Sequence, residues 1–248
     1  MPIKLHRPHK DLAPKRLGII KFATALATIA MLGGCAYTEN SDIANPVVRK
    51  ASWFSYLNAE DIRTACSAGQ AEGQIRIVYN ADYYKEVRSF DVLPQPGHDG
   101  FVVESHVFGP IDVSDLNVSV RSPLGAFSGD PVRNQITRQQ YLTLTDALQQ
   151  DGFGTQDRDG LRLNSENYYW VALGCSGQHM TLAAWTSAKD DLRDLHFPVV
   201  LEKISGQSTP LPAAPDPDAV KNPDPVYGND KDLRDRNFYR TVRGNSLQ

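Results

Sequence analysis

Apolar and polar residues alternate along much of residues 51–206, and this period of two is typical of β-strands. Ile75, Ile77 and Tyr79 fall on one face of a predicted strand, and a turn at 80–82 leads into a partner strand at 83–93. The same alternation predicts strands at 101–108, 116–121, 168–173, 179–186 and 199–204. Parallel neighbours need a crossover of about a dozen residues or more, so the close succession of strands favours an antiparallel sheet.

Two segments have the pattern of helices. Thr137 and Gln140 form a capping box, apolar residues follow at helical spacing through 148, and Gly152 stands where a C-terminal cap is expected. Asn58 is a suitable N-cap for a shorter helix through about Ser67. The predicted fold class is therefore α+β, a mainly antiparallel sheet or sandwich with one or two packed helices.

Composition divides the chain after residue 34 into three parts. Residues 35–50 contain few apolar side chains and are predicted to form a flexible tether. Residues 51–206 are predicted to form a single α+β domain, long enough to bury its own core. Six prolines fall between Pro210 and Pro225, so residues 207–248 are predicted to form a Pro/Asp-rich disordered tail.

The N-terminus has the organisation of a secretory signal. Lysines and arginines up to residue 16 precede an apolar stretch, whose uncharged part at 22–34 is shorter than the roughly 20 residues that cross a bilayer. The segment Leu32-Gly33-Gly34-Cys35 at its end resembles the lipobox of bacterial lipoproteins. The resemblance implies that residues 1–34 are a signal peptide and that Cys35 carries diacylglycerol and a further acyl chain such as palmitate. Ala36, in place of an aspartate, implies sorting to the outer membrane, with the domain facing the periplasm.

Charge and cysteine content fit this reading. Residues 1–34 hold six of the 26 Lys and Arg and one of the 29 Asp and Glu, so the remaining chain carries 20 basic and 28 acidic residues, a net charge of −8. Such an acidic chain is not expected to bind nucleic acid. With Cys35 assigned to lipid, Cys66 and Cys175 are left as a predicted disulfide in an oxidising compartment, with two separate buried thiols or a reactive one as the alternatives.

Several residues have chemistry that merits testing against the structure. Asp157, Asp159 and Glu166 partly match a calcium loop, although Thr155 replaces its first aspartate. The histidines lack the short spacings of zinc sites; they are His98, His106, His179 and His196. Cys175 with His179 is a weaker candidate for a nucleophile and its base. No metal or other cofactor is predicted from these patterns.

The C-terminal segment after the prolines mixes charged and aromatic residues. Arg234, Arg236, Phe238, Tyr239 and Arg240 are of the types enriched at interfaces, so they are candidates for partner binding by a tail that folds on its partner.

Together these features predict an outer-membrane-anchored lipoprotein with a non-catalytic binding domain, an adaptor in an envelope assembly. An envelope hydrolase is one alternative, and a binder of cell-wall glycan or of a small ligand is the other. Converging polar groups in a concave site would favour the hydrolase.

Overall fold

The computed structural model describes residues 36–38, 41–83, 85–109, 131–216 and 238–248. The chain divides into two compact units, 1–36 and 37–248, and every helix and strand discussed below belongs to the second. The strand predicted at 116–121 and the residues Cys35, Arg234 and Arg236 lie outside the described residues.

A six-stranded antiparallel sheet forms the middle of the second unit, which confirms the predicted α+β class. Its strand order is β4-β3-β2-β1-β6-β7. The strands are β1 (Ile75–Ala81), β2 (Glu86–Pro94), β3 (Gly100–Phe108), β4 (Val132–Thr137), β6 (Tyr168–Ser176) and β7 (His179–Thr186). The predicted hairpin is β1 with β2, and the pairing of β1 with β6 places both in the centre of the sheet.

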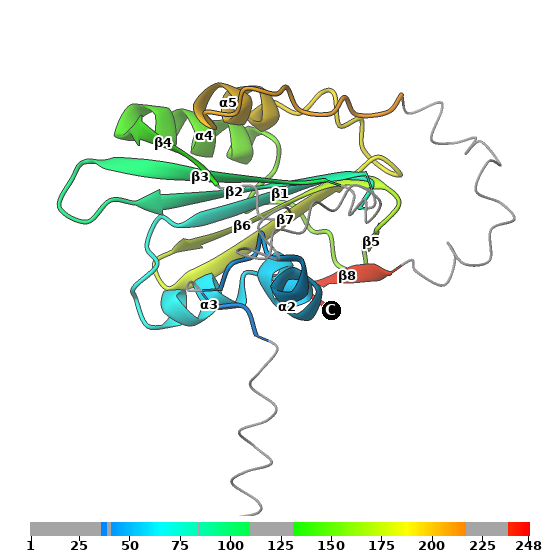
Figure 1. The fold of residues 1–248 in the computed structure, drawn as a ribbon, viewed down its shortest axis with the longest axis horizontal. Helices are drawn as coiled ribbons and strands as arrows, with labels where there is room; N and C mark the ends of the chain where they lie inside the picture. The colour runs from blue at the N-terminus through cyan, green and yellow to red at the C-terminus, as the bar shows by residue number, and fades with distance from the viewer. Residues whose placement is uncertain (1–35, 39–40, 84, 110–130, 217–237) are drawn as a thin grey trace, which may run out of the picture. The chain divides into compact units, whose positions relative to one another are not determined.

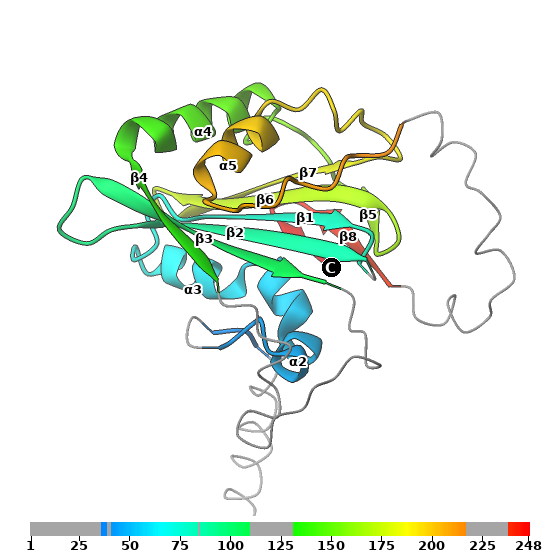
Figure 2. The same ribbon diagram turned by 45° about the horizontal axis from the view of Figure 1, so that its top comes forward.

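Both faces of this sheet are covered, as Figures 1 and 2 show. One face packs against helices α4 (Arg138–Gln150) and α5 (Phe197–Ile204). The other packs against α2 (Pro46–Leu57), α3 (Glu60–Ser67) and a small sheet of β5 (Arg162–Asn164), β8 (Tyr239–Arg243) and β9 (Ser246–Leu247). Because of this double cover, all seven residues of β1 are buried, and the adjacent Tyr169 and Trp170 of β6 are buried on opposite faces.

Helix α4 is the predicted helix with its capping box: the Thr137 side chain accepts from the Gln140 backbone, and the Gln140 side chain accepts from Thr137 in return. The predicted N-cap of α3 is wrong. Ala59, in a left-handed conformation at φ 49°, precedes α3, while Asn58 ends α2. The Asn58 side-chain oxygen instead accepts a hydrogen bond from the backbone N–H of Leu247, near the C-terminus of the chain.

The strand predicted at 199–204 is also wrong, because these residues belong to α5. Pro198 lies in the first turn of that helix, where proline is well tolerated. Phe197, Leu201 and Ile204 follow at helical spacing and are buried against the sheet. A short apolar run is compatible with the period of a strand and with that of a helix. Here the packing of one side of the segment against the sheet favours the helix.

Both predicted domain boundaries differ from the structure. Tyr37 and Ile43 are buried in the core and α2 begins at Pro46, so the described residues 41–50 belong to the folded domain and are not a flexible tether. At the other end, the Tyr79 hydroxyl donates to the Pro212 carbonyl at 3.0 Å, and Val242 of β8 is buried. The described parts of the predicted tail, 207–216 and 238–248, therefore pack on the domain.

Candidate functional site

A buried ionic network occupies the sheet face beneath α2 and α3. Arg76 of β1 donates from its two terminal nitrogens to the carboxylate of Asp61 on α3, at 2.8 and 2.9 Å. Its Nε donates to Asp91 of β2 at 2.6 Å. The register explains this meeting, because Arg76 and Asp91 are direct partners across β1 and β2. One guanidinium thus joins α3 to the central strands.

The rings of Tyr37 and Tyr56 cover the Arg76 guanidinium. The Arg76 guanidinium lies 3.9 Å from the ring centroid of Tyr56 and 5.1 Å from that of Tyr37. The Tyr56 hydroxyl hydrogen-bonds with Asp91 at 2.9 Å and with Ser89 at 2.7 Å. Burial raises the pKa of Tyr56 well above its ordinary value, and the negative charge of Asp91 adds to this shift. Burial alone would lower the pKa of Arg76, but Asp91, Tyr56 and Asp61 raise it. The raised pKa keeps the Arg76 guanidinium positively charged at all ordinary pH.

The polar residues continue across β3 toward the sheet edge. Glu104 and His106 are the cross-strand partners of Asp91 and Ser89. The Glu104 carboxylate lies 3.2 Å from His106 Nε2 and accepts from Arg133 of β4 at 2.7 Å. The hydrogen bond with His106 is the main cause that lowers the pKa of Glu104 to about 2; burial opposes it and Arg133 reinforces it.

His106 is the least satisfied member of this group. Its ring is buried and stacks on Phe108 with centroids 5.7 Å apart. Its Nδ1 atom has no hydrogen-bond partner among the residues that the structure describes. This nitrogen is therefore a buried polar atom without a hydrogen bond in the described part of the chain.

Such a network supports structure more readily than proton transfer. A general acid or base works best when its pKa lies near the operating pH. The low pKa of Glu104 keeps it a weakly basic carboxylate, and Arg76 holds its charge. The arrangement fixes Tyr37, α2 and α3 on the sheet.

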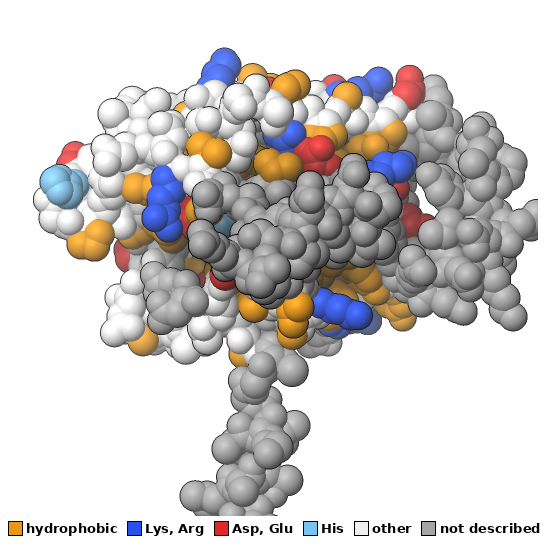
Figure 3. Space-filling view, viewed as in Figure 1, with side chains coloured by type: hydrophobic (Ala, Val, Ile, Leu, Met, Phe, Trp, Pro, Cys, Tyr) orange, Lys and Arg blue, Asp and Glu red, His pale blue; other side chains and the backbone are white. Residues whose placement is uncertain are grey.

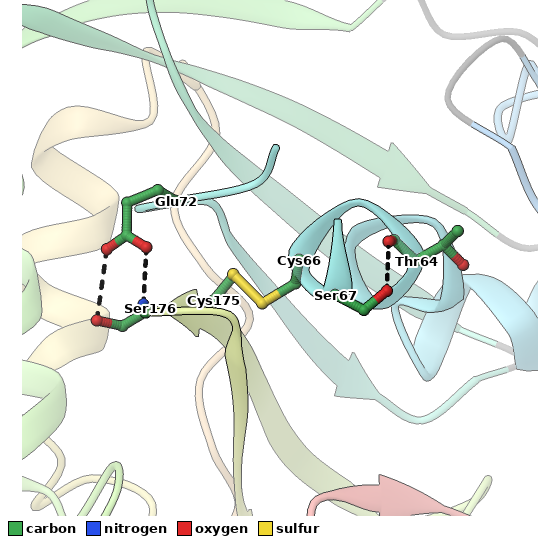
Figure 4. Close-up of a disulfide and its surroundings, with 7 residues drawn as sticks. Thr64, Cys66, Ser67, Glu72, Cys175 and Ser176 are labelled. Atoms are coloured by element: carbon green, nitrogen blue, oxygen red, sulfur yellow. Dashed lines mark hydrogen bonds between the residues drawn. A yellow bond between two sulfur atoms is a disulfide. The ribbon is translucent and has the colours of Figure 1, made fainter. Parts of the chain in front are cut away.

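The predicted disulfide is confirmed. Cys66 in the last turn of α3 is bonded to Cys175 near the end of β6, with their Cα atoms 5.7 Å apart (Figure 4). The carboxylate of Glu72 accepts from the Gly177 backbone at 2.7 Å and tightens the same corner. Because Cys175 is oxidised, the alternative in which it acts as a nucleophile with His179 as its base is wrong.

The remaining histidines are far from forming a common site. His98 and His179 are exposed, and His196 pairs through Nδ1 with Asp151 at 2.7 Å at the start of α5. Within the described ranges, no three His, Cys, Asp or Glu side chains are grouped closely enough to hold a metal ion.

The partial calcium loop has a different arrangement from a metal site. Asp159 accepts from the Gly244 backbone at 3.0 Å and from Arg243 at 3.1 Å, so it binds the turn between β8 and β9. Asp157 accepts from the backbone of Asp159 at 3.1 Å, as in an ordinary Asx turn. Glu166 is exposed in the turn before β6.

The described tail candidates contact the domain itself. Phe238 packs edge-on against Phe54, with ring centroids 5.1 Å apart, and also against Tyr83. The Arg240 guanidinium lies 3.7 Å from the Phe54 centroid. Tyr239 points the other way along β8 and is 53% exposed.

Sequence reasoning missed the network around Arg76. A signal was present, because Arg76 and Asp91 each interrupt an otherwise apolar strand, as Ile75-Arg76-Ile77 and Phe90-Asp91-Val92. Charged residues are seldom buried unless they are paired, so two such interruptions in neighbouring strands indicate a buried pair.

Comparison of the chain with protein-family models, curated proteins and solved structures yields no match. None of the helices in the described part of the chain has the length and apolar character needed to cross a bilayer.

Proposed function

We propose that this chain is a bacterial lipoprotein, anchored through Cys35 in the outer membrane, whose periplasmic domain acts by binding, as an adaptor in an envelope assembly. The lipobox resemblance at 32–35 motivates the anchor. The disulfide between Cys66 and Cys175 fits the oxidising compartment to which such a signal leads.

The observation that carries the proposal is the position of Tyr37. Its backbone N–H donates to the Ser55 hydroxyl of α2 at 2.9 Å, and its ring packs on Tyr56. The folded domain thus begins two residues after Cys35. With so short a connection, a lipid on Cys35 would hold the domain at the bilayer surface.

The proposal favours binding over catalysis on physical grounds. Asp61, Asp91 and Glu104 each pair with an arginine, and Tyr56 is held on Asp91. Because these side chains are already paired, the network rigidifies the domain. A rigid domain loses little conformational entropy when it binds a partner.

The anchor is tested by metabolic labelling with a clickable palmitate analogue. The native chain is expected to incorporate the label and to fractionate with the outer membrane. Cys35→Ala should lose the label and leave the membrane fraction, whereas Cys66→Ala with Cys175→Ala should keep it. Labelling that survives Cys35→Ala would overturn the anchor.

The adaptor role is tested by crosslinking in intact cells followed by mass spectrometry. The native chain is compared with one in which residues 217–237 are replaced by a Gly-Ser segment of equal length, so that β8 and β9 are retained. A stoichiometric envelope partner captured by the native chain is expected, and its loss on replacement would place the contact in 217–237. If neither chain captures an envelope partner, the adaptor role is contradicted.

A second candidate function is binding of a cell-wall glycan or small ligand. The observation that points to it is the buried Nδ1 of His106 beside Glu104, which has no hydrogen-bond partner among the described residues. Titration with soluble peptidoglycan fragments, followed by nitrogen NMR of the histidine rings, tests it. A shift of the His106 Nδ1 signal that saturates supports a ligand site there, and an unchanged signal contradicts it.

A further inference from the structure

Helix α2 and the adjacent strand β8 present exposed apolar side chains together with cations. Val47 is 65% exposed and Phe54 40%. Figure 3 shows hydrophobic and basic side chains side by side along the lower edge of the domain, where α2 and β8 lie. We call the set formed by Val47, Lys50, Phe54 and Arg240 the α2–β8 surface.

In the described part of the chain, the cations of this surface have no acidic partner. The Arg240 guanidinium lies 3.7 Å from the Phe54 ring centroid. Among the described residues, no carboxylate forms an ion pair with Lys50 or Arg240, whereas several exposed arginines do pair: Arg133, Arg138, Arg193 and Arg243. The surface is therefore locally cationic on a chain that carries −8 after residue 34.

Chain length links this surface to the lipid attachment point. Consecutive Cα atoms are about 3.8 Å apart, so the Cα atoms of Cys35 and Tyr37 are separated by about 7.6 Å at most. The backbone of Tyr37 is bonded to Ser55, the neighbour of Phe54 on α2. A lipid on Cys35 therefore holds α2 close to the bilayer.

We propose that the α2–β8 surface lies on the phospholipid headgroups of the leaflet into which the Cys35 lipid inserts. This rests on the anchor proposed above. Aromatic side chains are favoured at the water–bilayer boundary, and Lys and Arg near the surface are attracted to anionic headgroups. Since α4 and α5 cover the opposite face of the sheet, they point away from the membrane and leave that layer to soluble partners (Figure 2).

Tryptophan quenching in proteoliposomes tests the orientation. The lipidated protein, purified from membranes, is reconstituted in phosphatidylethanolamine with about one quarter phosphatidylglycerol and a trace of lipid with a headgroup nitroxide. Three variants are compared: Phe54→Trp and Val47→Trp on the α2–β8 surface, and Leu142→Trp, 40% exposed on α4, as the matched control. The parent protein supplies the background of its buried tryptophans, which are Trp53, Trp170 and Trp185.

The nitroxide is expected to quench the added tryptophan of Phe54→Trp and Val47→Trp at least twofold more than that of Leu142→Trp. Val47 has no packing role comparable to that of Phe54, so its variant keeps the test valid if Phe54→Trp is unstable. Protein that floats with the vesicles but shows equal quenching at all three positions overturns the orientation and leaves the anchor intact. Protein that does not float overturns the anchor, and the orientation with it.

Discussion

The ring of Tyr37 packs edge-on against the ring of Tyr56, with centroids 4.8 Å apart and planes at 79°. Tyr37 is the first residue of the compact domain, and Tyr56 hydrogen-bonds to Asp91 in the Arg76 network. The contact therefore connects the N-terminal end of the domain to a buried ion pair on the central strands. Disturbing that network should loosen the N-terminal segment as well as the sheet.

Arg76→Met should lower the free energy of unfolding by about 3 to 5 kcal/mol, because Asp61 and Asp91 then remain buried without a counter-charge. Urea denaturation measures this change. Arg193→Met, at an exposed pair with Asp191, is the matched control and should cost at most about 1 kcal/mol. Equal losses in both variants would show that the Arg76 pair is no more stabilising than a surface pair.

Glu104→Gln should reduce the sensitivity of the protein to acid. The pKa of Glu104 is about 2 in the folded chain against 4.5 for the free group. The unfolded chain therefore takes up this proton first, so the stability that the ionised group contributes is present above pH 4.5 and is lost as the pH falls toward 2. Thermal melts between pH 7 and 2 should show a shallower acid decline for the variant. An identical decline would exclude Glu104 as a source of it.

Replacing both Cys66 and Cys175 by alanine should destabilise the domain by about 4 to 5 kcal/mol in the chain-entropy model, because the bond closes a loop across 109 residues of sequence. Denaturation of the double variant and of the reduced native protein should give matching midpoints. If reduction leaves the native midpoint unchanged, the bond does not contribute to stability.

Val242→Ala should cost about 2 kcal/mol, because the side chain is 1% exposed and packs in the core beneath the small sheet. Tyr239→Ala, three residues away on the opposite side of β8 and 53% exposed, should change stability by less than about 0.5 kcal/mol. Denaturant unfolding of the two variants measures both changes and shows whether the C-terminal strand packs on the domain. A neutral Val242→Ala would indicate that β8 does not dock.

Local pattern was enough for several elements of this fold. The capping box and helical spacing of α4 involve residues within a few turns of one another. The alternation in β1, β2, β6 and β7 identified them as strands, although both faces of the sheet are covered. The pairing of Cys66 with Cys175 followed from the assignment of Cys35 to lipid and was confirmed.

Contacts between distant residues decided the rest. Residues 199–204 form a helix because Phe197, Leu201 and Ile204 pack on a sheet built from elsewhere in the chain. The neutralisation of Arg76 requires β1, β2 and α3 to meet, and the position of β8 depends on β5. The sequence by itself determined the alternation of the central strands and the capping box of α4, since these depend on neighbouring residues. Only the tertiary structure decided which charges pair and where both ends of the domain dock, because those energies arise between segments far apart in the chain.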